Sequence, residues 1–116
     1  VRKSSFLNSC ELIVCMWNKG HTWNFTKQSR MHNFIECPKC MGRERIKSPK
    51  HPTQKPLAVL KHIIQIASNE NDIVLDMFMG VASTGVAAVQ LNRRFIGIEI
   101  DEDYYNAGVK RMSEIN

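Results

Sequence analysis

Two carboxylates and a glycine-containing loop are the residues of this sequence best suited to hold a ligand. Asp76 closes a short β-branched run, and Glu99 lies 23 residues later in a second apolar run. Between them the sequence L-D-M-F-M-G-V-A-S-T-G covers residues 75–85. Strand ends in doubly wound sheets face ligands, and glycine lets a ligand approach the backbone closely. The pattern therefore indicates a binding site at the ends of two neighbouring strands.

Three ligand classes compete for this loop. A phosphate-binding P-loop requires G-x-x-x-x-G-K-[ST]; Gly80 and Gly85 have that spacing, but valine and alanine follow where lysine and a hydroxyl are needed. A dinucleotide loop requires G-x-G-x-x-G, but Ala82 replaces its second glycine and Asp76 would repel a pyrophosphate. A cationic ligand fits better, because Asp76 can receive an ammonium group directly or through water.

The two carboxylates also suit the two ends of one particular cation. Ser83 and Thr84 offer hydroxyls to a carboxylate or to a water molecule. Glu99 can accept both ribose hydroxyls of a nucleoside, as acids at this place do in dinucleotide folds. With an amino-acid end near Asp76 and a ribose near Glu99, the arrangement suits S-adenosylmethionine. The alternative is that both carboxylates only cap helices.

Apolar spacing in the second half of the chain predicts the elements that must position these residues. Helical spacing follows Pro56, and short apolar runs predict two strands. The expected elements are a helix at 56–67, a strand at 72–76, a loop at 77–82, a helix at 84–91, a strand at 95–100 and a helix from 101 onward. This order predicts the α/β class, with a parallel sheet covered by helices.

The first half of the chain is organised differently. The apolar run at 11–17 is closed by the turn sequence N-K-G and predicts a buried strand. Residues 21–50 are polar, basic and unpatterned, which predicts a long irregular segment. We divide the chain into residues 1–50, a strand with a basic region, and residues 51–116, the ligand-binding α/β portion, within one structural domain.

Composition and charge narrow the class of partner. The 116 residues are 43% hydrophobic, which is enough for one small core. Residues 1–62 carry 12 lysines and arginines against three glutamates, so a polyanion would bind to this half of the chain. The alternative is a basic loop that is only solvated. No apolar stretch is long enough to span a membrane, and four cysteines without an apolar export signal favour reduced thiols in the cytoplasm.

Three motifs taken together resemble one enzyme family. The sequence has H-P-T-Q-K-P at 51–56, D-M-F-M-G at 76–80 and G-I-E at 97–99. This combination resembles the amino-methylating DNA methyltransferases, the adenine-N6 and cytosine-N4 enzymes of restriction–modification systems and phages. The similarity is close over residues 46–112 and looser before them. It implies part of a doubly wound, Rossmann-like sheet that binds S-adenosylmethionine, in the subgroup whose catalytic motif precedes its cofactor motif.

The resemblance also implies roles for particular residues. The D-x-F-x-G motif forms the floor of the cofactor pocket, the glutamate holds the ribose, the next isoleucine lies against the adenine, and the H-P-T-Q-K-P segment lies beside the methionine end. The expected cofactor contacts are Asp76, Phe78, Gly80, Ser83, Thr84, Glu99 and Ile100, with Thr53 and Lys55 secondary. For Lys55 the alternative is a surface lysine that caps a helix. The basic region falls where the family recognises its target DNA, and the expected phosphate contacts are Lys27, Arg30, Arg43, Arg45 and Lys47.

The sequence departs from the family in two places. The family loop commonly has D-P-F-M-G-S-G-T-T-G, whereas Met77 replaces the proline and Val81-Ala82 replaces Ser-Gly, which should crowd or weaken cofactor binding. The catalytic motif [DNS]-P-P-[YFW], which holds the target amino group and stacks on the flipped base, is missing because the sequence contains no Pro-Pro. We therefore name no catalytic residue. We expect the C-terminal portion of a larger methyltransferase, inactive alone, with a second chain or an N-terminal segment supplying the catalytic motif.

A non-catalytic nucleic-acid-binding module is the alternative from another functional class. The sequence C-P-K-C at 37–40 has the spacing of half a zinc site, and His21, His32, Cys10 and Cys15 are the available further ligands. In this interpretation zinc stabilises the basic arm. Binding of S-adenosylmethionine distinguishes the methyltransferase portion from such a module.

Overall fold

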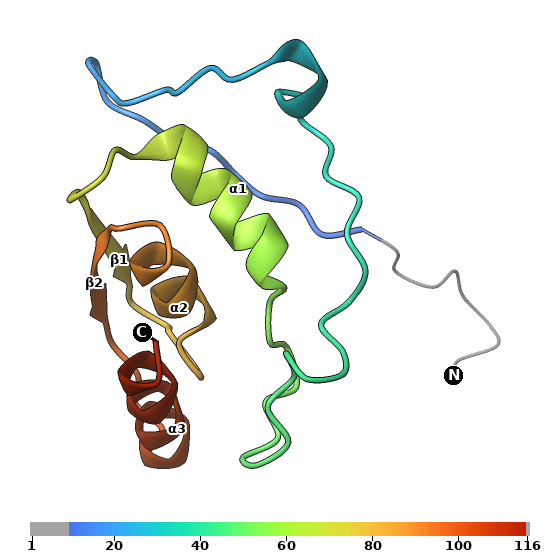
Figure 1. The fold of residues 1–116 in the computed structure, drawn as a ribbon, viewed down its shortest axis with the longest axis vertical. Coiled ribbons are helices and arrows are strands. Elements are labelled where there is room, and N and C mark those ends of the chain that lie inside the picture. The colour runs from blue at the N-terminus through green and yellow to red at the C-terminus, as the bar shows by residue number, and fades with distance from the viewer. Residues whose placement is uncertain (1–9, 116) are drawn as a thin grey trace, which may run out of the picture.

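The computed structural model describes residues 10–115 and contains three α-helices beside a two-stranded sheet (Figure 1). In chain order the elements are a 3-10 helix at Gln28–Arg30, α1 at Leu57–Ala67, β1 at Ile73–Asp76, α2 at Ser83–Val89, β2 at Arg94–Gly97 and α3 at Glu102–Ser113. The expected order of helices and strands from residue 56 onward is confirmed, with ends that differ by up to three residues.

The two strands form a parallel pair, which confirms the α/β class. Ile73 pairs with Arg94 and the register continues to Asp76 opposite Gly97. Past the last pair, Ile98 N donates to Asp76 O at 2.9 Å. Because both strands run in the same direction, the chain leaves β1 and β2 at the same edge of the sheet.

The core lies where α2 packs between α1 and the sheet. Ala87 and Ala88 of α2 are fully buried, and Ile64 of α1 packs against them. Val74 and Phe95 reach the same cluster from β1 and β2. The two alanines let α2 approach both neighbours closely, so this short helix is held by packing on two sides.

The buried strand expected at 11–17 is wrong. The segment has no strand structure, and Leu12 and Met16 are 93% and 88% exposed. An apolar run becomes a buried strand only when its backbone pairs with another strand, and within the described residues β1 pairs with β2 alone. In Figure 1 the segment runs past α1 and reaches neither strand.

Residues 21–50 form the long irregular segment that their composition predicts, apart from the single turn of 3-10 helix. Asn24 anchors this segment to the end of α1. Its backbone N–H donates to Ile66 O at 2.7 Å, and its side-chain amide donates to Gln65 O and Ser68 O at 3.0 and 2.8 Å. These bonds satisfy carbonyls that the last turn of a helix leaves without partners.

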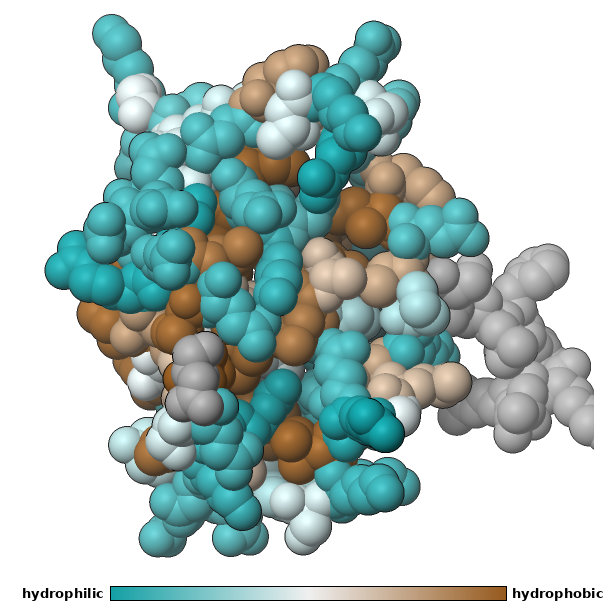
Figure 2. Space-filling model, viewed as in Figure 1, coloured by the Kyte–Doolittle hydropathy of each residue, from teal (hydrophilic) through white to brown (hydrophobic). Residues whose placement is uncertain are grey.

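One face of the sheet is apolar and open to solvent. Alternation along the strands turns Val74 and Phe95 toward α2, whereas Ile73, Leu75 and Ile96 on the other face are 52%, 55% and 51% exposed. Figure 2 shows hydrophobic side chains reaching the surface between polar ones on the face it presents. Parallel sheets are normally covered on both faces. Within residues 10–115, no helix is long and apolar enough to cross a membrane.

Candidate functional site

Asp76 and the residues after β2 lie together at the carboxyl edge of the sheet. Asp76 is the last residue of β1, and its Oδ1 accepts a hydrogen bond from Phe78 N at 3.0 Å. Met79 N donates to Ile98 O at 2.9 Å, which ties the loop after β1 to the chain that leaves β2. The structure therefore brings the two predicted carboxylate positions to one edge, as parallel pairing requires.

Glu99 organises the backbone on both sides of this edge. Its Oε2 accepts from Gly80 N at 2.8 Å, and its Oε1 accepts from Ile100 N and Asp101 N, both at 2.9 Å. The bond from the Asp101 amide is the main cause that lowers the pKa of Glu99, with the Gly80 and Ile100 amides adding to it against the opposing effect of desolvation. A carboxylate has about four acceptor positions, so Glu99 keeps about one free, on Oε2. To accept hydrogen bonds from both ribose hydroxyls, the Glu99 carboxylate would have to give up its bond to one backbone amide.

His51 closes the other side of the loop. A Cβ on Gly80, whose φ is +53°, would lie 2.7 Å from His51 Nε2. The His51 ring also meets the Tyr104 ring edge to face, with centroids 4.7 Å apart and an interplanar angle of 61°. The H-P-T-Q-K-P segment and the loop after β1 are thus in contact through a residue that sequence reasoning did not select. Its place at the head of the motif was the available signal.

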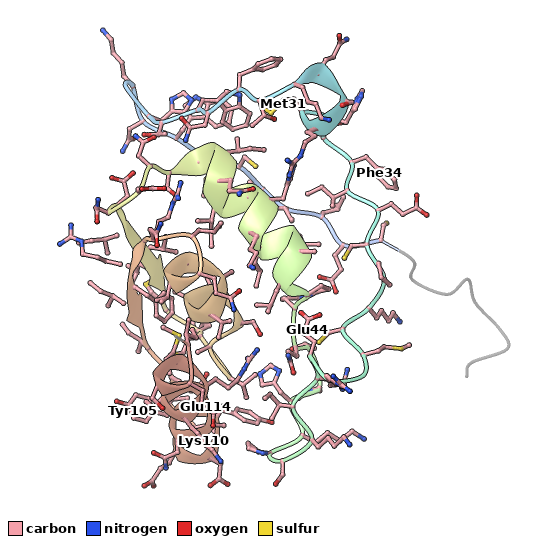
Figure 3. All side chains as sticks on the ribbon, viewed as in Figure 1. Met31, Phe34, Glu44, Tyr105, Lys110 and Glu114 are labelled. Atoms are coloured by element: carbon pink, nitrogen blue, oxygen red, sulfur yellow. The ribbon has the colours of Figure 1, made fainter. Side chains whose placement is uncertain are left out.

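The segment before α1 is held in place by its own hydrogen bonds. Gln54 is buried; its Nε2 donates to Glu44 O at 2.7 Å and its Oε1 accepts from Ile46 N at 2.9 Å. The Glu44 carboxylate accepts from Leu57 N at 2.6 Å and so caps α1; Figure 3 shows Glu44 beside the start of this helix. These bonds fix His51 against the loop although the segment has no regular structure.

The secondary cofactor candidates on this segment lie at the surface. Thr53 is exposed, and Lys55 is 49% exposed and pairs with Glu11, with 2.6 Å between Nζ and Oε2. The hydrogen bond from Lys55 is also the main cause that lowers the pKa of Glu11. In this arrangement the ammonium group of Lys55 pairs with Glu11, in the segment that precedes the basic region.

The hydroxyl at the start of α2 faces an arginine. Ser83 is buried and its Oγ accepts from Arg111 Nη1 at 3.2 Å, while the same nitrogen donates to Val81 O. Burial lowers the pKa of Arg111, and the nearby Cys40 thiol and Glu44 carboxylate oppose that effect. Nothing in the helical spacing of α3 singled out Arg111, because its partners are 28 and 30 residues away in sequence.

The remaining loop residues differ in exposure. Phe78 is 87% exposed and Ile100 is fully exposed, so both leave apolar surface open at the carboxyl edge; Thr84 is half-buried. Of the residues that depart from the family loop, Met77 is 57% exposed, whereas Val81 and Ala82 are buried. The Val81 side chain therefore belongs to the interior beneath the loop.

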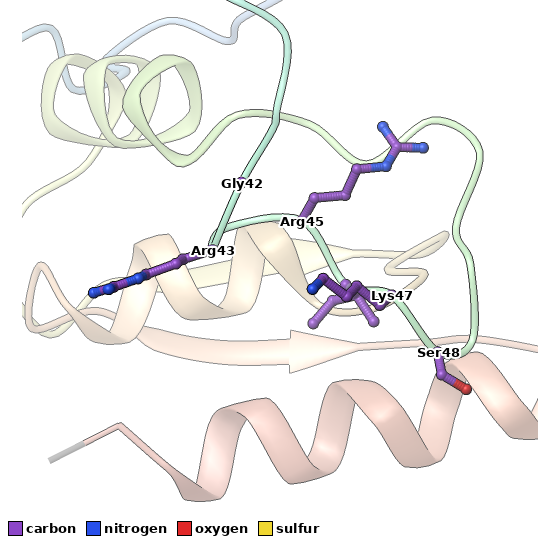
Figure 4. A pocket seen from close by; sticks show the side chains of 6 residues that line it. Gly42, Arg43, Arg45, Lys47 and Ser48 are labelled. Atoms are coloured by element: carbon purple, nitrogen blue, oxygen red, sulfur yellow. The ribbon is translucent and has the colours of Figure 1, made fainter.

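Three of the five expected DNA contacts surround an open hollow. Arg43, Arg45 and Lys47 line a space of about 710 Å³ together with Gly42, Ile46 and Ser48 (Figure 4). Arg45 is half-buried and its Nη2 donates to His51 O at 3.2 Å, whereas Arg43 and Lys47 are exposed. Lys27 and Arg30, at the 3-10 helix, are also exposed but lie near the opposite end of α1 (Figure 1).

The described cysteines and histidines do not assemble a metal site. Among residues 10–115, no group of three or more His, Cys, Asp or Glu side chains is placed to hold a metal ion. Cys40 is buried, which raises the pKa of its thiol, and Cys37 is half-buried. The zinc-stabilised arm therefore has no support in this part of the chain.

The chain is similar to DNA methyltransferases in sequence and in structure. The sequence model of a family described as DNA methylase matches residues 6–110. The DNA adenine methyltransferase YhdJ of Escherichia coli K12 is 53% identical over 93 residues, which are 80% of this chain and 27% of that protein. The type II methyltransferase M.HinfI of Haemophilus influenzae is 44% identical over 80 residues, which are 66% of this chain and 22% of that protein. The chain thus spans about a quarter of the length of these relatives.

Solved structures give the same result. The crystal structure of the M1.HpyAVI–SAM complex superposes with a TM-score of 0.67 at 40% identity, over 79% of this chain and 44% of that one. The cytosine-N4-specific PvuII DNA methyltransferase superposes with a TM-score of 0.52 at 28% identity, over 57% of this chain and 24% of that one. The Rossmann-like fold that the sequence predicts is confirmed. From the match over most of its length, the chain belongs to the DNA methylase family.

Proposed function

We propose that this chain is the cofactor-binding and target-recognition portion of a site-specific DNA amino-methyltransferase, and that it binds S-adenosylmethionine at the carboxyl edge of β1 and β2. The observation that carries the proposal is the pair Asp76 and Glu99 at one edge of the sheet: Asp76 ends β1, and Glu99, two residues beyond the parallel strand β2, accepts from the Gly80 amide in the loop that follows Asp76. The solved relative in complex with S-adenosylmethionine, at 40% identity, supports the same ligand.

The residues at this edge fit the chemical groups of that cofactor. Asp76 uses Oδ1 for the Phe78 amide, so Oδ2 can accept the ammonium group. Glu99 can accept one ribose hydroxyl on Oε2, and the exposed side chains of Phe78 and Ile100 offer apolar surface to the adenine. When bound, the cofactor supplies a methyl group on a sulfonium. The task of these side chains is to bind and orient it.

Target DNA would meet the basic hollow at 42–48. The exposed Arg43 and Lys47 are suited to phosphate oxygens, since their cationic groups face solvent beside the hollow. Arg45 already donates to His51 O. It thereby connects the hollow to the H-P-T-Q-K-P segment, which contacts the loop after β1 at residues 77–82 (the cofactor loop). The acceptor is the exocyclic nitrogen of a flipped adenine or cytosine, and the 53% identity to an adenine methyltransferase favours adenine.

Methyl transfer needs residues beyond these 116. The [DNS]-P-P-[YFW] motif does not occur in the sequence, and among residues 10–115 the sheet has an exposed apolar face and no strand paired to the outer edge of β1 or of β2. We therefore infer that the chain is inactive alone, and that another segment or chain of the same enzyme class brings the catalytic motif and completes the sheet.

Isothermal titration calorimetry with S-adenosylmethionine tests the binding site. Asp76→Asn and Glu99→Gln keep side-chain volume and remove one negative charge each, and we expect each to weaken binding about tenfold or more, as loss of a charged hydrogen bond does. Glu70→Gln, an exposed carboxylate remote from the edge, should bind as the parent chain does. Equal affinities for all four proteins would refute the site, and DNA binding without any cofactor binding would favour a nucleic-acid-binding module.

A further inference from the structure

Arg111 ties α3 both to the loop after β1 and to the first residue of α2. Its Nη1 donates to the Val81 carbonyl and to Ser83 Oγ, the latter at 3.2 Å. Arg111 is half-buried, so these bonds are partly shielded from water, which strengthens hydrogen bonds from a charged donor. The two acceptors lie on either side of a single residue, Ala82.

Ala82 has a backbone conformation that residues with a side chain avoid. Its φ of 57° and ψ of 38° are left-handed, and its side chain is completely buried at the start of α2. A non-glycine residue stays in this region only when its surroundings hold it there. At this position the family loop that the sequence resembles commonly has glycine, which adopts the conformation without strain.

A second contact shows how closely α3 supports the loop. A Cβ on Gly108 would lie 3.1 Å from the Ala82 Cβ and 3.3 Å from Gly80 O. Gly108 and Arg111 are three residues apart and thus share one face of α3. On this face of α3, Gly108 packs against Ala82, and Arg111 donates hydrogen bonds to the residues before and after Ala82.

We propose that Arg111 is a positioning residue for the cofactor loop: it holds the left-handed turn at Ala82 and thereby keeps the Gly80 amide and the start of α2 in their binding geometry. The inference rests on the proposed function, because the ligand of this loop is taken to be S-adenosylmethionine. Arg111 acts through the loop backbone and does not itself touch the ligand.

A double-mutant cycle tests this role. Calorimetry with S-adenosylmethionine should show about tenfold weaker binding for Arg111→Met and a change within about twofold for Ala82→Gly. The double variant should bind within about threefold of the parent chain, because glycine keeps the left-handed turn without help. If Arg111 only stabilised the fold, Arg111→Met would lower the unfolding temperature, and adding Ala82→Gly would not restore the binding of S-adenosylmethionine.

Lys110→Met is the matched control. Lys110 is the neighbour of Arg111 on α3, carries the same charge and is exposed (Figure 3). Amide hydrogen exchange of residues 77–84 adds a readout that needs no cofactor. Exchange there should be faster in Arg111→Met, unchanged in Lys110→Met, and slower again once Ala82→Gly is added.

The outcomes separate the two proposals. The positioning role is overturned if Arg111→Met leaves exchange of the loop unchanged, if the double variant binds as weakly as Arg111→Met, or if Lys110→Met weakens binding equally. If the parent chain does not bind S-adenosylmethionine while Arg111→Met still loosens the loop and Ala82→Gly restores it, the proposed function fails and the positioning role stands.

Discussion

Gly80 has no room for a side chain, for two independent reasons. Its φ is +53°, and a Cβ would lie 2.7 Å from His51 Nε2. We expect Gly80→Ala to lower the free energy of unfolding by about 1–3 kcal/mol, from backbone strain and displacement of the His51 ring. Urea denaturation measures the loss. Gly20 has a φ of +82°, but a Cβ there would meet no atom within 4 Å. The stability lost in Gly20→Ala therefore measures the backbone strain alone.

Removal of the His51 ring should recover part of that loss. In the background of His51→Ala, Gly80→Ala should cost no more than Gly20→Ala does in the parent chain. If the cost of Gly80→Ala stays the same without the ring, the close approach of His51 to the loop is not what excludes a side chain.

Glu99 should make stability depend on pH in a defined direction. Its backbone hydrogen bonds hold its pKa below the ordinary value of 4.5, so its contribution is fully present above that value and is lost as pH falls through the lower, folded-state pKa. The difference in Tm between the parent chain and Glu99→Gln should therefore be largest near neutral pH and shrink toward pH 3. A difference that is constant from pH 7 to pH 3 would contradict this assignment.

At the scale of elements, α3 begins with a side-chain cap. Asp101 Oδ1 accepts from Tyr104 N at 3.0 Å. We expect Asp101→Ala to lower the free energy of unfolding by about 1 kcal/mol, and Asp101→Ser to restore most of it. Asp103→Ala removes only a charge from the first turn and should cost less, because it lacks the capping bond. Chemical denaturation of the three variants measures these differences.

The elements that the sequence predicted are those whose stabilising contacts are local. The spacing after Pro56 and the two β-branched runs place their apolar side chains against α2, which is near in sequence, so α1, β1, α2, β2 and α3 could be predicted. The run at 11–17 has the same composition as a strand but no partner strand among residues 10–115, and propensity alone cannot supply one. The contacts of His51 and Arg111 were also missed, since both depend on how distant segments meet.

At the scale of the whole molecule, the first half of the described chain is loosely folded against the second. The radius of gyration is 15.5 Å, whereas a compact domain of about this length has roughly 13 Å. The difference reflects the extended path of residues 10–50, with exposed apolar side chains such as those of Leu12 and Trp17. Together with the open face of the sheet, this shape supports the proposal that another segment or chain completes the sheet.

The open face of the sheet should cause self-association. We expect the chain to associate with increasing concentration, because Ile73, Leu75 and Ile96 leave contiguous apolar surface beside strand edges that nothing pairs with in the described part of the chain. Sedimentation velocity should show weaker association for the double variant Ile73→Thr and Ile96→Thr. Val74→Thr, on the face against α2, should instead lower the unfolding temperature and leave the association in place.

We propose that one small cation, S-adenosylmethionine, binds at the carboxyl edge of β1 and β2. Titration of the isotope-labelled chain with S-adenosylmethionine, followed by amide chemical shifts, tests it most directly. The amide resonances of Phe78, Gly80 and Ile100 should shift together, with one binding isotherm, while those in the middle of α1 should not change. Shifts confined to residues 42–48, or none at saturating cofactor, would contradict it.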